Sequence, residues 1–224
     1  MSKNMKGVLG NQYGKVGPVV ARKFRNENVY SAYQGNVANP RTTKQQTHRA
    51  RFAAMSELAH NMACGAIFGF RTWAKGTKWS PRNVFQKYNW DSITTTGQGT
   101  LNIDYTSLVV AKGGLSNVSF EAPSFDVPSQ VAMDFTDNGA ACQRTPNDTA
   151  YMVVYCPDMK QAIMSAGKKI SEGSSLDVSV PADWNGLKVH IWGFTRNEGD
   201  GVPELGIVAG ECSDSQYCGS GNIG

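Results

Sequence analysis

The residues best suited to chemistry in this sequence are a glycine-rich segment near its start and three histidines. Residues 10–16 approach a phosphate-binding loop, in which a lysine and a hydroxyl must follow the last glycine, but the segment is one residue short and ends in Val16. His48, His60 and His190 accompany no H-E-x-x-H helix and no nucleophile elbow. We therefore expect a protein that is not an enzyme and that uses no cofactor and no metal.

His190 alternates with apolar neighbours, which is typical of a residue in a packed wall rather than of a catalytic base. The acidic residues of the second half fall in expected turns, where aspartate favours local backbone hydrogen bonds. The spacing of the acidic residues does not exclude the two catalytic carboxylates of a glycosidase, because these need only be close in the folded structure.

The five cysteines, at positions 64, 142, 156, 212 and 218, have no metal-site spacing. Cys64 and Cys156 are expected to be buried free thiols. Cys212 and Cys218 lie close enough along the chain to pair, whereas a protein made in the cytoplasm usually keeps its thiols reduced. The pairing of these two therefore stays open.

Charge is the strongest signal in the sequence. Residues 1–94 hold 15 Lys and Arg against 3 Asp and Glu, giving +12, whereas residues 95–224 hold 7 against 15, giving −8. A basic half with so few acids of its own indicates an acidic partner: nucleic acid, an acidic protein surface, or the acidic half of a neighbouring copy. The plain alternative is that these residues only solubilise an apolar region. The basic residues expected to contact a partner or nucleic acid are Arg22, Lys23, Arg25, Arg41, Lys44, Arg49 and Arg51.

The first 40 residues indicate an extended, glycine-rich arm with one or two short strands near residues 19–21 and 29–33. A helical segment is expected over residues 41–95. Its first helix should run from about 43 to 64, begin at a capping box that pairs Thr42 or Thr43 with Gln45 or Gln46, and stop at Gly65. The apolar face of this helix is predicted as Phe52, Met55, Ala59, Met62 and Ala63.

A second helix is expected over about 80–89, because Ser80 and Pro81 form a cap residue followed by a first-turn proline. Trp73, Trp79 and Trp90 surround it. Tryptophans so close together can stack on bases or sugars, but large aromatics more often fill a core. We expect these three to anchor a helical hairpin.

From residue 96 to 212 the apolar pattern alternates with a period of two, as in residues 131–135, 151–155, 176–180 and 187–191. Six to eight short strands with glycine-rich turns predict an antiparallel β-sandwich of immunoglobulin or fibronectin type III kind. The expected fold class is thus α+β, with the arm and helical segment preceding the sandwich. The Gly/Ser-rich tail, residues 213–224, is expected to be mobile or held by a partner.

Two segments carry a resemblance to a known family. Residues 14–20 read Gly-Lys-Val-Gly-Pro-Val-Val, and residues 39–46 read Asn-Pro-Arg-Thr-Thr-Lys-Gln-Gln. Together with the strand that ends in Tyr155-Cys156-Pro157, they resemble a family of unknown function from Bacteroidota genomes and their phages. The resemblance spans about residues 5–210 and implies an immunoglobulin-like C-terminal domain and a role among phage virion components.

These observations lead to three functional hypotheses. The first is a non-enzymatic structural component of a bacteriophage virion, made in the bacterial cytoplasm, which assembles through its basic half with other copies or other virion proteins and does not enter a membrane. The second is a nucleic-acid-binding protein associated with the packaged genome. The third is an adhesion or glycan-binding module that uses Trp184 and Trp192, although both faces of the strand carrying Trp192 look covered.

Overall fold

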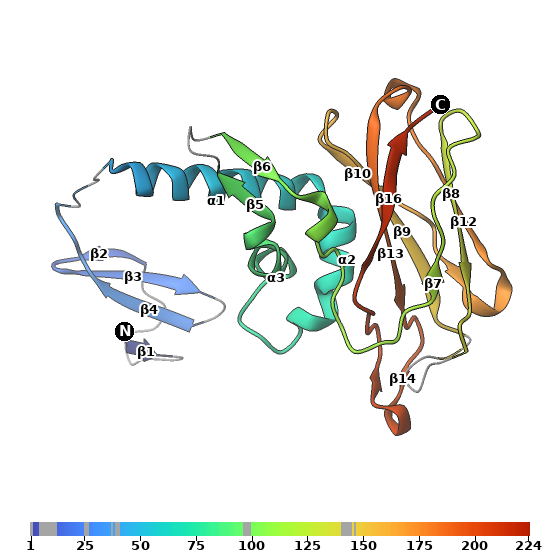
Figure 1. The fold of residues 1–224 in the computed structure, drawn as a ribbon. Coiled ribbons are helices and arrows are strands. Elements are labelled where there is room, and N and C mark those ends of the chain that lie inside the picture. The colour runs from blue at the N-terminus through green and yellow to red at the C-terminus, as the bar shows by residue number, and fades with distance from the viewer. Residues whose placement is uncertain are drawn as a thin grey trace. The chain divides into compact units, whose positions relative to one another are not determined.

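In this computed structural model, the described residues are 2–4, 13–24, 27–36, 38, 41–95, 100–139, 145 and 147–224. The chain divides into two compact units, residues 1–45 and residues 46–224 (Figure 1). Arg25, Asn39, Pro40 and Cys142 lie outside the described residues.

The N-terminal unit contains a four-stranded antiparallel sheet in the order β1-β4-β3-β2. Its strands are β1 (Ser2–Asn4), β2 (Gly14–Val16), β3 (Val19–Phe24) and β4 (Glu27–Ala32). Gly17 takes the left-handed region at φ +57° in the tight turn between β2 and β3, a conformation that glycine adopts without strain. The two expected short strands are therefore present, and they belong to a larger sheet than the sequence predicted.

The helical part of the chain holds α1 (Thr43–Asn61), α2 (Ala63–Ala74) and α3 (Pro81–Tyr88). The backbone N–H of Gln45 donates to Thr42 Oγ1 at 3.4 Å, which is one half of the expected capping box. Ser80 caps α3 by accepting from the Asn83 backbone N–H at 3.2 Å, and Pro81 opens the helix as predicted.

Gly65 does not end the first helix, contrary to the prediction. The chain starts α2 at Ala63 and continues through Gly65 and Gly69. Both glycines have a packing role, because a Cβ on Gly65 would lie 3.0 Å from Val153 Cγ2 and a Cβ on Gly69 would lie 2.7 Å from Ala111 Cα. The missing side chains let α2 approach the strands and the 108–112 segment closely.

Two antiparallel sheets follow the helices (Figure 1). The larger has the order β10-β9-β13-β16, and β11 also pairs with β9. The smaller has the order β12-β8-β7. The strands of the larger sheet are β9 (Thr149–Cys156), β10 (Gln161–Met164), β11 (Lys168–Lys169), β13 (Lys188–Arg196) and β16 (Gln216–Asn222). Those of the smaller are β7 (Ser119–Phe120), β8 (Gln130–Thr136) and β12 (Ser175–Ser179).

Two short hairpins lie outside these sheets. One pairs β5 (Ile93–Thr95) with β6 (Leu101–Ile103), and the other pairs β14 (Gly201–Val202) with β15 (Ile207–Val208). The alternating segments at 131–135, 151–155, 176–180 and 187–191 all contribute to strands, as the sequence predicted.

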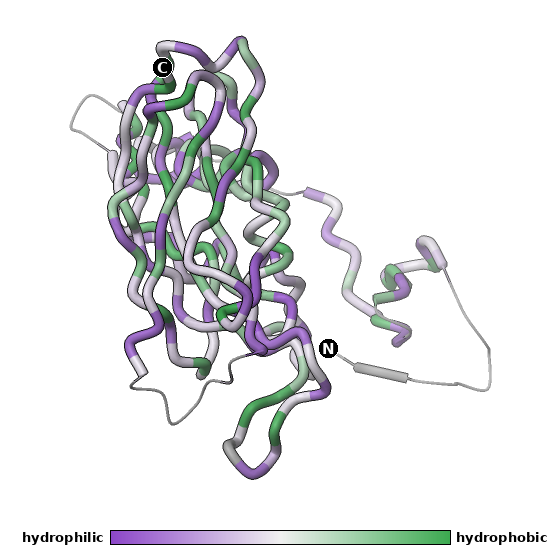
Figure 2. Tube along the Cα trace, turned by 90° about the vertical axis from the view of Figure 1, so that its right-hand side faces the viewer, coloured by the Kyte–Doolittle hydropathy of each residue, from purple (hydrophilic) through white to green (hydrophobic). Residues whose placement is uncertain are grey.

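Two apolar cores lie on opposite faces of the larger sheet. Met152, Val154 and Ile191 face the smaller sheet, where they pack with Met133 and Val178. On the other face, side chains from β9 and β13 pack against the helices; these are Tyr151, Val153, Tyr155, Trp192 and Phe194 with Met55, Leu58, Met62 and Phe70. Both faces of β9 are therefore buried along its whole length, whereas more buried and more exposed residues alternate along β8 and β12. Figure 2 shows hydrophobic and hydrophilic residues interspersed along the chain.

The structure corrects two further expectations. The tail is not loose: β16 pairs with β13 from Lys188 to Gly193, and Gly221 lies so close to Phe125 that a Cβ there would clash. Phe52, predicted in the apolar face of the first helix, is 52% exposed, because burial along α1 begins only at Met55.

The chain thus has a mixed α+β fold, in which the 46–224 unit layers helices, a larger sheet and a smaller sheet. No helix in the described part of the chain is both long and apolar enough to span a bilayer.

Candidate functional site

The predicted contact residues of the N-terminal unit lie at its surface. Arg22 and Lys23 are exposed near the end of β3, and Arg41 and Lys44 are exposed at the start of α1. Arg25 lies outside the described residues. Across residues 1–45 the sequence places 8 Lys and Arg against Glu27 alone, a net charge of +7.

The other two predicted residues, Arg49 and Arg51, belong to the 46–224 unit, so the structure does not bring the seven together in one compact unit. Arg51 forms hydrogen bonds and an ion pair within its own chain. Its guanidinium donates to the Trp90 carbonyl oxygen and to Asp91 Oδ1 at 3.0 Å, and lies 4.4 Å from the centroid of the Trp90 ring. This side chain joins α1 to the turn that follows α3 and has a structural role.

The N-terminal sheet buries little of its apolar surface. Among the described residues of this unit, only Ala21, Asn28 and Val29 are buried. Several large apolar side chains are exposed, namely Tyr13, Val16, Val19, Phe24 and Tyr33. Lys15 Nζ lies 3.4 Å from the centroid of the Tyr33 ring, so cationic and aromatic groups share this surface.

A second surface, on α2, α3 and the turn between them, was misjudged from the sequence. The prediction that Trp73 and Trp79 anchor a hairpin core is wrong, since their side chains are 45% and 44% exposed. Phe70 and Phe85 fill the core between the two helices instead, with their ring centroids 6.1 Å apart in an edge-on arrangement. We call Trp73, Trp79, Lys87 and Tyr88 the tryptophan surface.

Local hydrogen bonds fix the turn that carries Trp79. Gly76 takes φ +79° just after α2, where a side chain would be strained. Thr77 Oγ1 donates to the Ala74 carbonyl oxygen at 2.9 Å and accepts from the Trp79 backbone N–H at 3.2 Å. The Ser80 cap follows directly.

The indole rings are also held in place. Trp73 Nε1 donates to the Tyr88 hydroxyl at 3.0 Å, which orients its ring beside α3. Lys87 Nζ lies 4.5 Å from the centroid of the Trp79 ring. A cation at this distance is attracted to the ring face and adds positive charge next to an exposed apolar plane.

Trp79 lines three adjacent hollows. The first, of about 320 Å³, is also lined by Trp73, Lys78, Lys87 and Tyr88. A second, of about 510 Å³, lies between α3 and Asp91 and includes Lys87 and Trp90. The third, of about 490 Å³, contains the cations Arg71, Lys75 and Arg196. Cations thus outnumber acids around Trp79.

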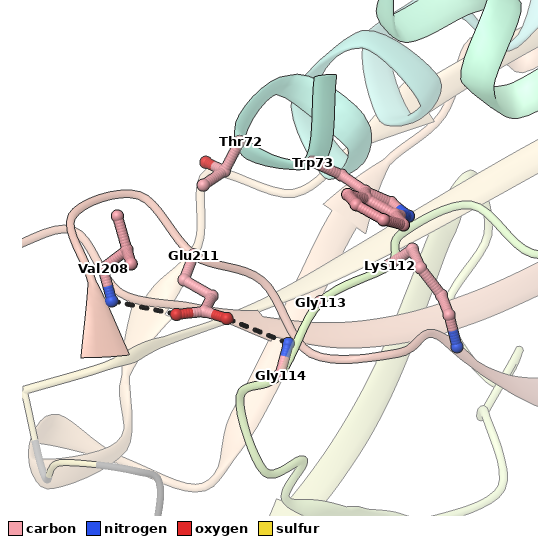
Figure 3. Close-up of a pocket in the computed structure, with 7 residues that line it drawn as sticks. All are labelled: Thr72, Trp73, Lys112, Gly113, Gly114, Val208 and Glu211. Atoms are coloured by element: carbon pink, nitrogen blue, oxygen red, sulfur yellow. Dashed lines mark hydrogen bonds between the residues drawn. The ribbon is translucent and has the colours of Figure 1, made fainter. Parts of the chain in front are cut away.

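A further hollow, of about 330 Å³, is lined by Thr72 and Trp73 of α2 together with Lys112 and Glu211 (Figure 3). Its acid, Glu211, accepts from the backbone N–H groups of Val208 at 2.9 Å and Gly114 at 3.1 Å. This carboxylate therefore fastens two loops together. Lys112, on the opposite wall of the hollow, forms an ion pair with Asp214.

The structure places His190 in a packed wall, as the sequence predicted. Its ring stacks on Tyr105 with centroids 4.3 Å apart, and Nδ1 lies 2.9 Å from the Tyr217 hydroxyl. Burial, with a smaller contribution from Lys188, lowers the pKa of His190 to about 4. The ring is therefore neutral near pH 7.

Burial likewise raises the pKa of the Cys212 thiol to about 12 and that of Cys218 to about 11, which makes both poor nucleophiles. Cys64, Cys156, Cys212 and Cys218 are all free, and the structure forms no bond between Cys212 and Cys218. Cys156 is buried as expected, whereas Cys64 is exposed. The described residues contain no group of three or more His, Cys, Asp or Glu side chains able to hold a metal ion.

Trp184 and Trp192 are fully buried, in the sheet-to-sheet core and in the core beneath the helices. They offer no face to a glycan. One sequence signal does point to the tryptophan surface: from Arg71 to Lys87 the chain carries five Lys and Arg and no Asp or Glu. A core-facing hairpin would not need such a bias.

The comparison with known families gives one match. The model of a family of unknown function (DUF6266) covers residues 10–206, and the chain therefore belongs to this family. A search of curated proteins found no match.

Proposed function

We propose that this member of the family of unknown function DUF6266 is a non-enzymatic structural protein that assembles through its N-terminal unit. The carrying observation is the exposed apolar surface of the four-stranded sheet, in a unit of net charge +7. An isolated small sheet without a large core is only marginally stable in water, so a partner that covers it would supply the missing burial.

Charge indicates what kind of partner fits this sheet. Residues 46–224 carry a net charge of −3, since the whole chain is +4 and the N-terminal unit is +7. A neighbouring copy therefore offers an acidic surface to the cationic sheet, and such head-to-tail contacts can extend into larger assemblies. We propose other copies of the chain as the first partners and further virion proteins as the next.

We propose a bacteriophage virion as the setting, because Pro40-Arg41-Thr42, followed by glutamines and a basic helix, resembles segments of phage virion components. We also propose that the two sheets of the 46–224 unit form a sandwich of immunoglobulin type. Support comes from the shared core between β8, β9, β12 and β13.

Matched valines test the assembly proposal. Val16 on β2 is 67% exposed, and Val127 near the smaller sheet is 54% exposed. We expect Val16→Asp to abolish self-association in sedimentation experiments, because it places a charge within the covered surface, while Val127→Asp leaves association unchanged. Wild-type association should weaken at high salt, because screening reduces the attraction between oppositely charged surfaces.

A strict monomer at both low and high salt would refute self-assembly. Loss of association in both valine variants would refute the assignment to the N-terminal sheet. For the virion setting, a mass-spectrometric inventory of purified phage particles should contain this protein at high stoichiometry, and its absence from the particles would refute that setting.

Nucleic-acid binding by the basic N-terminal half is the second candidate, favoured by the exposure of Arg22, Lys23, Arg41 and Lys44. Phosphate contacts by these four residues on duplex DNA would make affinity fall with log salt at a slope of about −4. A shift assay at several salt concentrations measures this slope. Absent or salt-insensitive binding would refute the candidate.

A further inference from the structure

The tryptophan surface has features that neither core packing nor solubility requires. Two indole rings are nearly half exposed, that of Trp73 on α2 and that of Trp79 in the turn before α3. Adjacent exposed apolar side chains with a polar rim are typical of interaction sites. The Tyr88 hydroxyl fixes the Trp73 indole, and Thr77 fixes the Trp79 backbone while Lys87 lies 4.5 Å from the Trp79 ring centroid.

The charge around these rings has one dominant sign. The hollow that Trp79 shares with Trp73 contains Lys78 and Lys87, and the hollow on its other side contains Arg71 and Lys75. Among the residues that line the three hollows around Trp79, the only acid is Asp91, next to Trp90. A ligand that fits must therefore carry negative charge beside flat apolar groups.

Single-stranded nucleic acid has this combination of groups. Its bases present planes that stack on aromatic side chains regardless of sequence, and a phosphate follows each base. A duplex keeps its bases stacked inside, so they cannot reach an indole in a surface hollow. A neutral glycan could stack on the rings, but it would not use the surrounding lysines and arginines.

We propose that the tryptophan surface binds single-stranded nucleic acid, with a base stacked on Trp79 and neighbouring phosphates on Lys87, Lys75 and Arg71. The site lies entirely in the 46–224 unit and uses none of the residues by which the N-terminal unit is proposed to assemble. Because the rings are already oriented in the free protein, binding pays little of the ordering cost that flexible loops would pay.

The experiment measures binding of full-length protein to a fluorescent oligothymidylate of about 16 nucleotides. We expect binding, with quenching of the exposed tryptophans. Stacking of one base is worth about 1–3 kcal/mol, so Trp79→Ala should weaken binding roughly 5- to 150-fold. Three phosphate contacts predict a slope of affinity against log salt of about −2.

Matched variants control for folding and for charge. Phe52→Ala removes an aromatic ring that is 52% exposed and lies on α1, outside the hollows, and should leave binding unchanged. Lys87→Gln should weaken binding, whereas Lys169→Gln, on β11, should not. Val16→Asp should abolish assembly and leave oligothymidylate binding intact, which separates this proposal from the assembly proposal.

Three results would overturn the proposal. One is equal affinity for oligothymidylate and for a duplex of the same length, since a duplex offers phosphates without stacking. Another is wild-type affinity in Trp79→Ala, with unfolding measurements confirming that the variant is folded. The third is binding of a neutral oligosaccharide in place of the oligonucleotide, which would assign the surface to glycans.

Discussion

Gly69→Ala is expected to destabilise this protein although helix propensity alone predicts the reverse. Gly69 lies inside α2, where alanine is favoured over glycine by about 1 kcal/mol. In the folded chain, however, a Cβ at this position would press against the Val110 carbonyl oxygen and lie 2.7 Å from Ala111 Cα. These are backbone atoms, which cannot move aside by changing a rotamer.

The contact at Gly69 sets the size of the effect. The Lys112 backbone N–H donates to the Gly69 carbonyl oxygen at 3.3 Å. To make room for a Cβ, the 110–112 segment would have to move away from α2, and this hydrogen bond opposes that movement. Overpacking of a core costs about 1–3 kcal/mol, and the rigid contact favours the upper end of that range. After the propensity gain, we expect a net loss of about 1–2 kcal/mol in the free energy of unfolding.

Gly65→Ala in the same helix is the matched control. Its Cβ would lie 3.0 Å from Val153 Cγ2, a side-chain atom that can shift by a few tenths of an ångström. Both substitutions gain the same helix propensity, so the difference between their free energies of unfolding measures the effect of the contact that each Cβ makes. We expect Gly65→Ala to be clearly less destabilising than Gly69→Ala.

Equilibrium urea unfolding followed by tryptophan fluorescence measures both variants, since Trp184 and Trp192 are buried in the 46–224 unit. With an m-value of about 2 kcal/mol/M, the Gly69→Ala midpoint should fall by roughly 0.5–1 M. A midpoint at or above that of the wild type would refute the close approach of α2 to the 110–112 segment.

Three further predictions follow from single side chains. Arg51→Ala should lower stability by about 1–2 kcal/mol in the same urea assay, because it leaves the Trp90 carbonyl oxygen without its donor, and unchanged stability would contradict a structural role. The pKa of His190 falls from 6.5 in the unfolded chain to about 4 in the folded protein, so the folded state binds fewer protons and stability should drop as the pH falls through this window. His190→Gln should therefore flatten the dependence of the melting temperature on pH between these two values. An unchanged pH dependence would refute this. All five thiols should react in denaturant without reductant, with Cys212 protected in the native protein, whereas three reactive thiols would indicate a bond between Cys212 and Cys218.

Patterns that depend on local chemistry could be predicted from the sequence. The alternation in residues 131–135 and 176–180 gave strands because one face of each is buried and the other is solvated. Ser80 and Pro81 marked the start of α3 because a cap residue and a first-turn proline act within four residues of the chain. The apolar neighbours of His190 along its strand predicted a packed wall, and the residue is 7% exposed.

Contacts distant in the sequence decided the rest. Gly65 looked like a helix stop because glycine is a poor helix former, yet α2 continues through it, and a Cβ there would lie 3.0 Å from Val153 Cγ2 on β9. The glycine-rich tail looked loose, but its residues from Gln216 to Asn222 pair with β13.

The candidate sites divide in the same way. Sequence alone determined the charge polarity, the lack of familiar catalytic motifs and the identity of the basic residues, because these depend only on which residues are present. Tertiary structure decided which of them are accessible. Phe70 and Phe85 fill the space between α2 and α3 and leave Trp73 and Trp79 at the surface. Arg51 forms an ion pair with Asp91 of its own chain. Which aromatic side chains fill the core, and which charged residue pairs with which, is decided only when the folded chain brings distant residues together.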